Sequence, residues 1–114
     1  MPAEKLFENK VKRYLVSKGI YPLGTPRDKM PVKPTGYWEK RWGGGTYTKS
    51  GLPDLHIVVN GYNIDVELKA PTGKASELQV FMINQINDSG SLALLLYPKD
   101  FEGFKKIIEN HLTL

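Results

Sequence analysis

The first part of the chain has apolar residues at helical spacing. Residues 3 to 18 carry an apolar stripe that recurs every three or four positions, which predicts an amphipathic helix that packs on a core. Gly19 follows at a position where glycine commonly ends a helix. The stripe consists of Phe7, Val11, Tyr14 and Leu15, and the residues expected to point outward are Lys5, Asn9 and Lys12.

A second pattern, with a period of two, lies in the middle of the chain. Two apolar-rich runs, Leu55 to Val59 and Ile64 to Leu68, flank the dipeptide Asn60-Gly61. Both residues of this dipeptide tolerate positive φ angles, so Asn-Gly between alternating runs is a strong signal for a β-hairpin. We therefore predict two antiparallel strands that are joined at this turn.

A capping box predicts a second helix, from Ser76 to about Ser89. Ser76 and Gln79 have the spacing at which each side chain bonds the main chain of the other residue, and Gly90 marks the end of the helix. The buried stripe of this helix is predicted to be Leu78, Met82 and Ile86.

The last quarter of the chain predicts a strand followed by a helix. Ser91 to Tyr97 contains a continuous apolar run of strand length, which is typical of a buried strand. Asp100 can cap a final helix that runs to about His111. The apolar face of that helix consists of Phe104, Ile107, Ile108 and Leu112, and short strands are also expected at Ile20-Tyr21 and Thr46 to Lys49.

Length and composition favour one α/β domain over residues 1 to 114. A strand, a crossover helix and another buried strand predict a mixed central sheet with helices on both faces. No run approaches the ~18 apolar residues of a membrane span, and the N-terminus lacks the apolar region of a signal peptide. The chain has no cysteine, which excludes disulfides and thiolate metal sites and fits a reducing compartment.

Positive charge is concentrated between residues 22 and 50. This segment has six bases and two acids, a surplus that equals the net charge of +4 of the whole chain. Bases interleaved with aromatic rings are typical of surfaces that bind single-stranded or distorted nucleic acid. Alternatively, Trp38 and Trp42 fill the core or a dimer interface. The candidates for nucleic-acid contact in this segment are Arg41, Trp42 and Lys49.

One face of the second hairpin strand carries ionisable side chains. Because side chains alternate along a strand, Asp65, Glu67 and Lys69 share the face opposite to the apolar residues. Asp54 opens the preceding strand, and the hairpin could bring it alongside Glu67. Converging carboxylates with a nearby lysine suit a hard divalent cation and a phosphate. A solvated sheet face is the alternative explanation.

These residues resemble a known nuclease motif. Pro53-Asp54 followed by Glu67-Leu68-Lys69 has the form of the PD-(D/E)XK motif. With Ser50-Gly51-Leu52 before it, and with Gly73-Lys74 and Gln79 after it, the string resembles the VRR-NUC branch in its small stand-alone viral or bacterial form.

The resemblance implies a fold, an activity and a metal site. The implied fold is a restriction-endonuclease-like αβββαβ core, with residues of about 25 to 47 as a basic and aromatic insertion. The implied activity is a Mg²⁺- or Mn²⁺-dependent DNA endonuclease that hydrolyses phosphodiester bonds. Lys69 would position the attacking water or stabilise the transition state. The implied metal ligands are Glu8, Asp54, Glu67 and the main-chain carbonyl of Leu68.

For several of these side chains the sequence allows both a structural and a functional role. The family carries a glutamate on its first helix in a setting similar to that of Glu8, whereas a favourable interaction with the helix dipole explains Glu4. Gln79 has a structural role in the capping box, and the glutamine of the family at this place points toward the active site. Lys74 lies in the loop before the second helix, where it could contact a phosphate or be solvated.

The resemblance also implies a partner and a substrate. Small stand-alone members look like homodimers that act on branched DNA such as four-way (Holliday) junctions, and two symmetric cuts need two subunits if each has one active site. The alternatives are a flap or nicking nuclease, and a nucleic-acid-binding module that does not cut. We expect an intracellular protein, from a bacterium or from the cytoplasm of a bacterial host, without a membrane partner.

Overall fold

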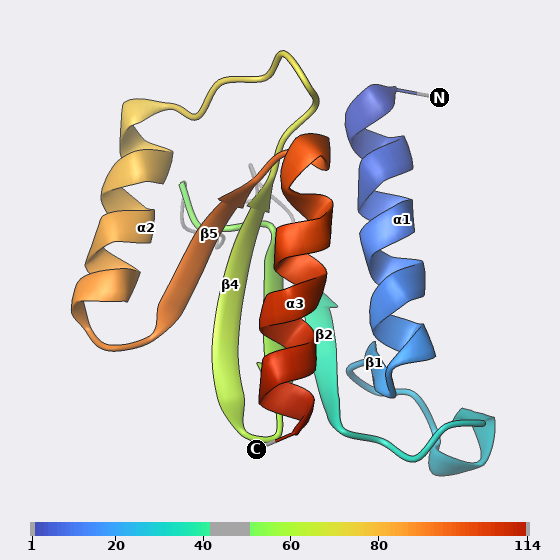
Figure 1. The fold of residues 1–114 in the computed structure, drawn as a ribbon. Coiled ribbons are helices and arrows are strands. Elements are labelled where there is room, and N and C mark those ends of the chain that lie inside the picture. The colour runs from blue at the N-terminus through green and yellow to red at the C-terminus, as the bar shows by residue number, and fades with distance from the viewer. Residues whose placement is uncertain (1, 42–50, 114) are drawn as a thin grey trace.

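A mixed β-sheet forms the centre of the molecule (Figure 1). The structure, a computed structural model, describes residues 2–41 and 51–113, and in these ranges the sheet has five strands in the order β1-β2-β3-β4-β5. The β1–β2 and β4–β5 pairs are parallel, whereas β2, β3 and β4 are antiparallel. The strands are β1 (Ile20–Pro22), β2 (Gly36–Lys40), β3 (Leu55–Val59), β4 (Tyr62–Leu68) and β5 (Leu92–Leu96).

Helices flank this sheet. The α-helices are α1 (Ala3–Ser17), α2 (Glu77–Asp88) and α3 (Phe101–Leu112), and two short 3₁₀ turns are η1 (Arg27–Lys29) and η2 (Pro98–Asp100). Figure 1 shows α1 and α3 next to each other in front of the sheet, with α2 beside β5. An edge-to-face contact of Phe7 with Phe101, at a centroid distance of 5.9 Å, joins α1 to α3. None of the described helices is long and apolar enough to cross a membrane.

The hydrophobic core lies between the sheet and the pair α1 and α3. Alternate residues of β3 and β4 face this core, and the predicted stripe of α1 packs on them. Gly19 ends α1 with a φ angle of +82°, as the sequence predicts. Fully buried residues of β3 and β4 in this core include Leu55, Ile57, Val59, Ile64 and Val66.

The central hairpin is confirmed, and its turn is the predicted one. Asn60 and Gly61 have φ angles of 48° and 82°, so both occupy the left-handed region that a two-residue hairpin turn of this type requires. The turn sets the register in which Leu55 lies opposite Val66 and Ile57 opposite Ile64.

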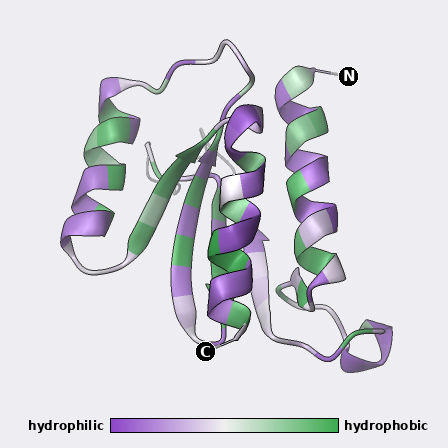
Figure 2. Ribbon diagram, viewed as in Figure 1, coloured by the Kyte–Doolittle hydropathy of each residue, from purple (hydrophilic) through white to green (hydrophobic). Residues whose placement is uncertain are grey.

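The predicted stripe of α2 is partly wrong. Leu78 is 43% exposed, whereas Ile83 is buried and Met82 and Ile86 are half-buried. Helix α2 packs on the edge strand β5, so the sheet covers a narrower face of this helix than its sequence predicts. Figure 2 shows apolar colours on β5 and on the first turns of α2, and Phe81 is 58% exposed there.

Three further expectations differ from the structure or lie outside it. Strand β5 is less buried than predicted, with Leu94 half-buried, because it is an edge strand. Asp100 has φ −98° and ψ 5° and makes no side-chain cap, since a cap needs an extended conformation and η2 precedes the helix. Strand β2 was not predicted, although it lies within the segment of residues 25 to 47, and the expected strand at Thr46 to Lys49 lies outside the described residues.

Candidate active site

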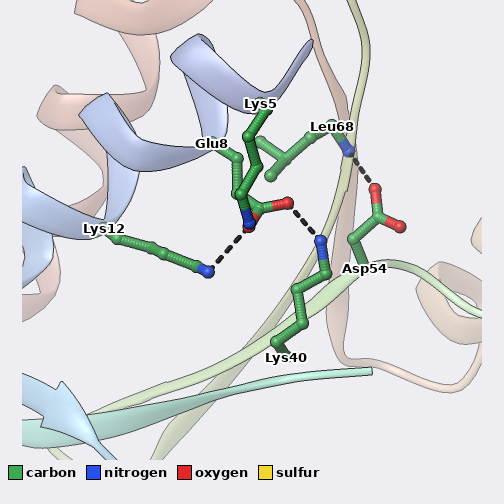
Figure 3. A network of polar contacts seen from close by, with 6 residues as sticks. All are labelled: Lys5, Glu8, Lys12, Lys40, Asp54 and Leu68. Atoms are coloured by element: carbon green, nitrogen blue, oxygen red, sulfur yellow. Dashed lines mark hydrogen bonds and ion pairs between the residues drawn. The ribbon is translucent and has the colours of Figure 1, made fainter. Parts of the chain in front are cut away.

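Asp54 and Glu67 meet at the end of the hairpin that lies away from the turn. Because Leu55 is opposite Val66, the next antiparallel pair brings Asp54 beside Glu67. The Asp54 Oδ2 atom accepts a hydrogen bond of 2.9 Å from the main-chain N–H of Leu68 (Figure 3). This bond fixes the Asp54 carboxylate at the end of β4, and the hairpin places Asp54 alongside Glu67 as predicted.

The Glu67 carboxyl group is buried beside a second carboxylate, that of Asp54. Glu67 is only 3% exposed. Burial, and next the charge of Asp54 and a hydrogen bond with it, raise the pKa of Glu67 to about 8, although Lys69 acts in the opposite direction. Its Oε1 atom is buried and has no hydrogen-bond partner among the described residues. A buried oxygen of this kind costs free energy unless a proton or a cation satisfies it.

Lys69 and Gln79 complete this group. The Gln79 side chain donates from Nε2 to Glu67 Oε2 over 3.2 Å, and its Oε1 accepts from Lys69 Nζ over 3.0 Å. Lys69 Nζ lies 3.6 Å from Glu67 Oε2. Gln79 therefore holds the carboxylate and the ammonium in one arrangement.

Gln79 also forms the predicted capping box of α2. Its Oε1 accepts from the main-chain N–H of Ser76 over 2.9 Å, and its own N–H donates to Ser76 Oγ over 3.1 Å. The two explanations for Gln79 are thus compatible, because one side-chain oxygen serves the helix end and Lys69 together. The helix end and the site are mechanically joined through this residue.

Glu8 is at the centre of a different cluster (Figure 3). Its Oε2 atom pairs with Lys5 Nζ at 2.8 Å and with Lys12 Nζ at 2.7 Å, and its Oε1 atom pairs with Lys40. Burial acts to raise the pKa of Glu8, but the hydrogen bonds and charges of these lysines outweigh it and lower the pKa to about 2. The expectation that Lys5 and Lys12 point away from the site is wrong, because a buried carboxylate draws both ammonium groups inward.

A cleft connects the Glu8 cluster with Asp54. It has a volume of about 340 Å³ and is lined by Pro2, Glu4, Lys5, Glu8, Lys40 and Asp54. Within residues 2–41 and 51–113, no three His, Asp or Glu side chains are close enough together to hold a metal ion. The structure thus brings Asp54 and Glu67 together, while Glu8 faces the same cleft but is occupied by lysines.

The donor set at Asp54 and Glu67 fits a hard divalent cation. Both residues offer carboxylate oxygens, which Mg²⁺ and Mn²⁺ prefer. Glu67 Oε1 lacks a partner in the described structure, and a cation would satisfy it. Burial first and the charge of Asp54 second raise the pKa of Glu67, and a bound cation would oppose both effects.

The residues predicted to contact nucleic acid differ in their surroundings. Arg41 Nη1 donates to Asp65 Oδ1 over 2.9 Å and to the carbonyl of Pro53 over 3.3 Å. Lys74 is exposed in the loop between β4 and α2. Trp42 and Lys49 lie outside the described residues. Trp38 is buried in the core, so the core explanation holds for this tryptophan.

Two features of this region were not predicted from the sequence. The first is the position of Lys40 at the end of β2, because the sequence pattern predicts no strand there. The aromatic pair Tyr37-Trp38 is the signal that favours this strand. The second is a contact between His56 and the buried Asp65 carboxylate, in which His56 Nδ1 lies 2.9 Å from Asp65 Oδ1. The pairing register of His56 with Asp65 follows from the hairpin and was available from the turn.

No protein-family model matches the chain, and no curated protein matches it. The interpretation of the site therefore rests on its own geometry and charge. Those features separate two groups at one end of the sheet, namely Asp54 with Glu67, Lys69 and Gln79, and Glu8 with its three lysines.

Proposed function

We propose that this chain is a divalent-metal-dependent DNA endonuclease that hydrolyses phosphodiester bonds. The observation that carries the proposal is the pairing of Asp54 with Glu67, whose buried Oε1 has no partner in the described structure, next to Lys69. Two neighbouring carboxylates with a lysine beside them are the groups needed to hold a hard cation beside a phosphate. An ordinary solvated strand face would leave Glu67 exposed instead of buried.

In this proposal Asp54, Glu67 and the carbonyl of Leu68 hold Mg²⁺ or Mn²⁺, and Glu8 joins them from α1. A bound ion would polarise the phosphate and lower the pKa of a water molecule. Lys69 supplies positive charge to the attacked phosphate or orients the water. Gln79 positions both Lys69 and Glu67 through its two hydrogen bonds.

The order of elements supports the finer assignment of the fold. Helix α1 is followed by the short strand β1, the antiparallel strands β2, β3 and β4, helix α2, the parallel strand β5 and helix α3. This order contains the αβββαβ core that we propose, with β1 and α3 in addition, and the motif residues lie just before β3, on β4 and just after it. We propose membership of the VRR-NUC branch on the same residues that carry the sequence resemblance.

Branched DNA, such as a four-way junction, is the substrate that we propose. Symmetric cutting of a junction needs two active sites, so the proposal includes a homodimer. The net charge of +4 and the exposed Lys74 support an anionic partner. Light scattering at micromolar concentration checks the dimer, and a monomer would contradict paired cutting.

The test is cleavage of end-labelled DNA by purified protein in Mg²⁺, Mn²⁺ or EDTA. A four-way junction, a flap, a nicked duplex and a plain duplex are compared, with Glu67→Ala and Lys69→Ala as controls. We expect symmetric junction cuts that disappear in EDTA and in both variants. Cuts confined to the flap or the nicked duplex would replace the substrate, and DNA binding without any cutting would indicate a binding module.

A further inference from the structure

Lys40 places an ammonium group inside the cleft that joins Glu8 to Asp54. The residue ends β2, where it lies opposite Leu55 of β3, so its position is set by the sheet. Its Nζ pairs with Glu8 Oε1, and its side chain lines the cleft together with Asp54. Figure 3 shows the Lys40 side chain extending toward Glu8, with Asp54 on its other side.

The three lysines around Glu8 differ in where they come from. Lys5 and Lys12 belong to α1 itself, one turn before and one turn after Glu8, and such pairs occur along many helices. Lys40 comes from the sheet, and its side chain is only 18% exposed. An ammonium at this exposure loses hydration and requires a carboxylate partner.

The cleft itself is rich in acids. Glu4, Glu8 and Asp54 line it, and of the lysines that pair with Glu8, Lys5 and Lys40 also line it whereas Lys12 does not. Such a lining attracts cations, and in this structure the ammonium of Lys40 is the group on Glu8 Oε1. That carboxylate oxygen can bind either the ammonium or a metal ion at full strength, but not both.

We propose that Lys40 is the built-in counter-ion of the cation site and competes with the divalent ion for Glu8. The inference rests on the proposed function, since it concerns the same metal site. Without a divalent ion, Lys40 provides the positive charge on Glu8 Oε1 inside the cleft, while Lys5 and Lys12 pair with Oε2. A divalent ion gains Glu8 only by displacing the ammonium, so Lys40 lowers the affinity of the site and sets the ion concentration at which Glu8 is recruited.

The test is calorimetric titration of the full chain with Ca²⁺, which probes the site without requiring cleavage. Removing the competing ammonium in Lys40→Met should tighten Ca²⁺ binding about tenfold, the equivalent of one charged hydrogen bond. Lys40→Gln serves as a second variant in case the first does not fold. Lys12→Met is the matched control, because it removes one charge from the other oxygen of the same carboxylate without lining the cleft, and it should tighten Ca²⁺ binding less than Lys40→Met does.

Two results would overturn the inference while the metal site stands. One is equal or weaker Ca²⁺ binding by Lys40→Met and Lys40→Gln when both are folded, and the other is the same gain in Lys12→Met. Glu67→Gln separates this failure from that of the proposed function. If Glu67→Gln binds Ca²⁺ as tightly as the wild type, or if the wild type binds none, the proposed metal site is itself wrong.

Discussion

Glu8 and Glu67 are equally buried, yet their protonation behaves in opposite ways. Each is 3% exposed, and each belongs to one of two neighbouring groups at the same end of the sheet. The pKa of Glu8 is lowered to about 2, whereas the pKa of Glu67 is raised to about 8. Burial alone acts in the same direction on both carboxyl groups.

The neighbours of each carboxyl group explain the difference. Glu8 has ammonium groups on both oxygens. Glu67 faces another carboxylate, Asp54, and Lys69 lies beyond ideal hydrogen-bond distance at 3.6 Å. Glu8 therefore has enough counter-charge to outweigh its burial, whereas Lys69 does not outweigh the burial of Glu67 and the charge of Asp54. The Asp54–Glu67 pair therefore has less positive charge around it than two buried carboxylates need, whereas Glu8 has ammonium groups on both of its oxygens.

The strongest test of this contrast is cleavage by glutamine variants of the two residues. Glu67→Gln should lower the metal-dependent cleavage rate roughly 10³-fold, because the amide keeps the volume but loses the charge that holds the ion. Glu8→Gln should lower it less, since Glu8 must first release Lys40. Glu102→Gln, on an exposed residue of α3, is the control and should cut at the wild-type rate. Equal losses for Glu8 and Glu67 would remove the distinction.

The pH dependence of stability should have opposite signs for the two groups. Glu67 in the folded state holds a proton between pH 4.5 and about 8 that the unfolded chain has lost, so its contribution to stability falls as pH rises through this window. Glu8 is ionised down to about pH 2 in the folded state. Its contribution is present above pH 4.5 and is lost as pH falls from 4.5 to about 2.

Urea unfolding at several pH values measures both windows. The loss between pH 4.5 and 8 should be on the order of 3 kcal/mol in the wild type and absent in Glu67→Gln. Saturating Ca²⁺ should also remove it, because the ion takes the place of the proton. A wild-type stability that does not fall between pH 5 and 8 would contradict the raised pKa of Glu67.

Glu8→Gln should destabilise the fold at neutral pH by about 2 kcal/mol, because it leaves ammonium groups near the core without a carboxylate. This loss is smaller than the full cost of breaking a buried ion pair, because the Lys5 side chain is 44% exposed and its ammonium can be hydrated. Urea unfolding at pH 7 is the measurement. The double variant Glu8→Gln with Lys40→Met should recover part of the lost stability. No recovery would mean that an unpaired Lys40 ammonium does not destabilise the fold.

The smallest effect separates the two roles of Gln79. Ser76→Ala removes the side-chain cap of α2 and should cost about 1 kcal/mol of stability, with cleavage close to wild type. Gln79→Ala removes the contacts to Glu67 and Lys69 as well, so it should lower cleavage much more than Ser76→Ala at similar stability. Thermal melts and initial cleavage rates give both quantities. Similar cleavage by the two variants would reduce Gln79 to a helix cap.

Local patterns predicted those parts of the fold and site that local interactions determine. Helix α1, the hairpin and the capping box of α2 follow from helical spacing, from Asn60-Gly61 and from Ser76 with Gln79. Because the hairpin register follows from the turn, the approach of Asp54 to Glu67 was predicted as well. The contact of Gln79 with Glu67 and Lys69 agrees with the direction that the resemblance implies.

The features that were missed depend on contacts between distant segments. Strand β2 has only the short pattern Tyr37-Trp38-Glu39-Lys40, and its place next to β3 is decided by pairing. The lysines around Glu8 could not be foreseen, since Lys40 reaches it from 32 residues away. Likewise, the exposure of Leu78 results from the edge position of β5, which no local pattern encodes.

The Asn60-Gly61 turn controls a site that it does not touch. Five residues of β4, from Tyr62 to Val66, separate the turn from Glu67, a span of roughly 20 Å in a strand. A loop one residue longer that shifted the pairing by one step would turn Glu67 toward the apolar core and Val66 toward the face that now carries Glu67. The side chains presented beside Asp54 at one end of the sheet thus depend on the length of a loop at the other end, and an insertion in that loop would change the candidate site at a distance.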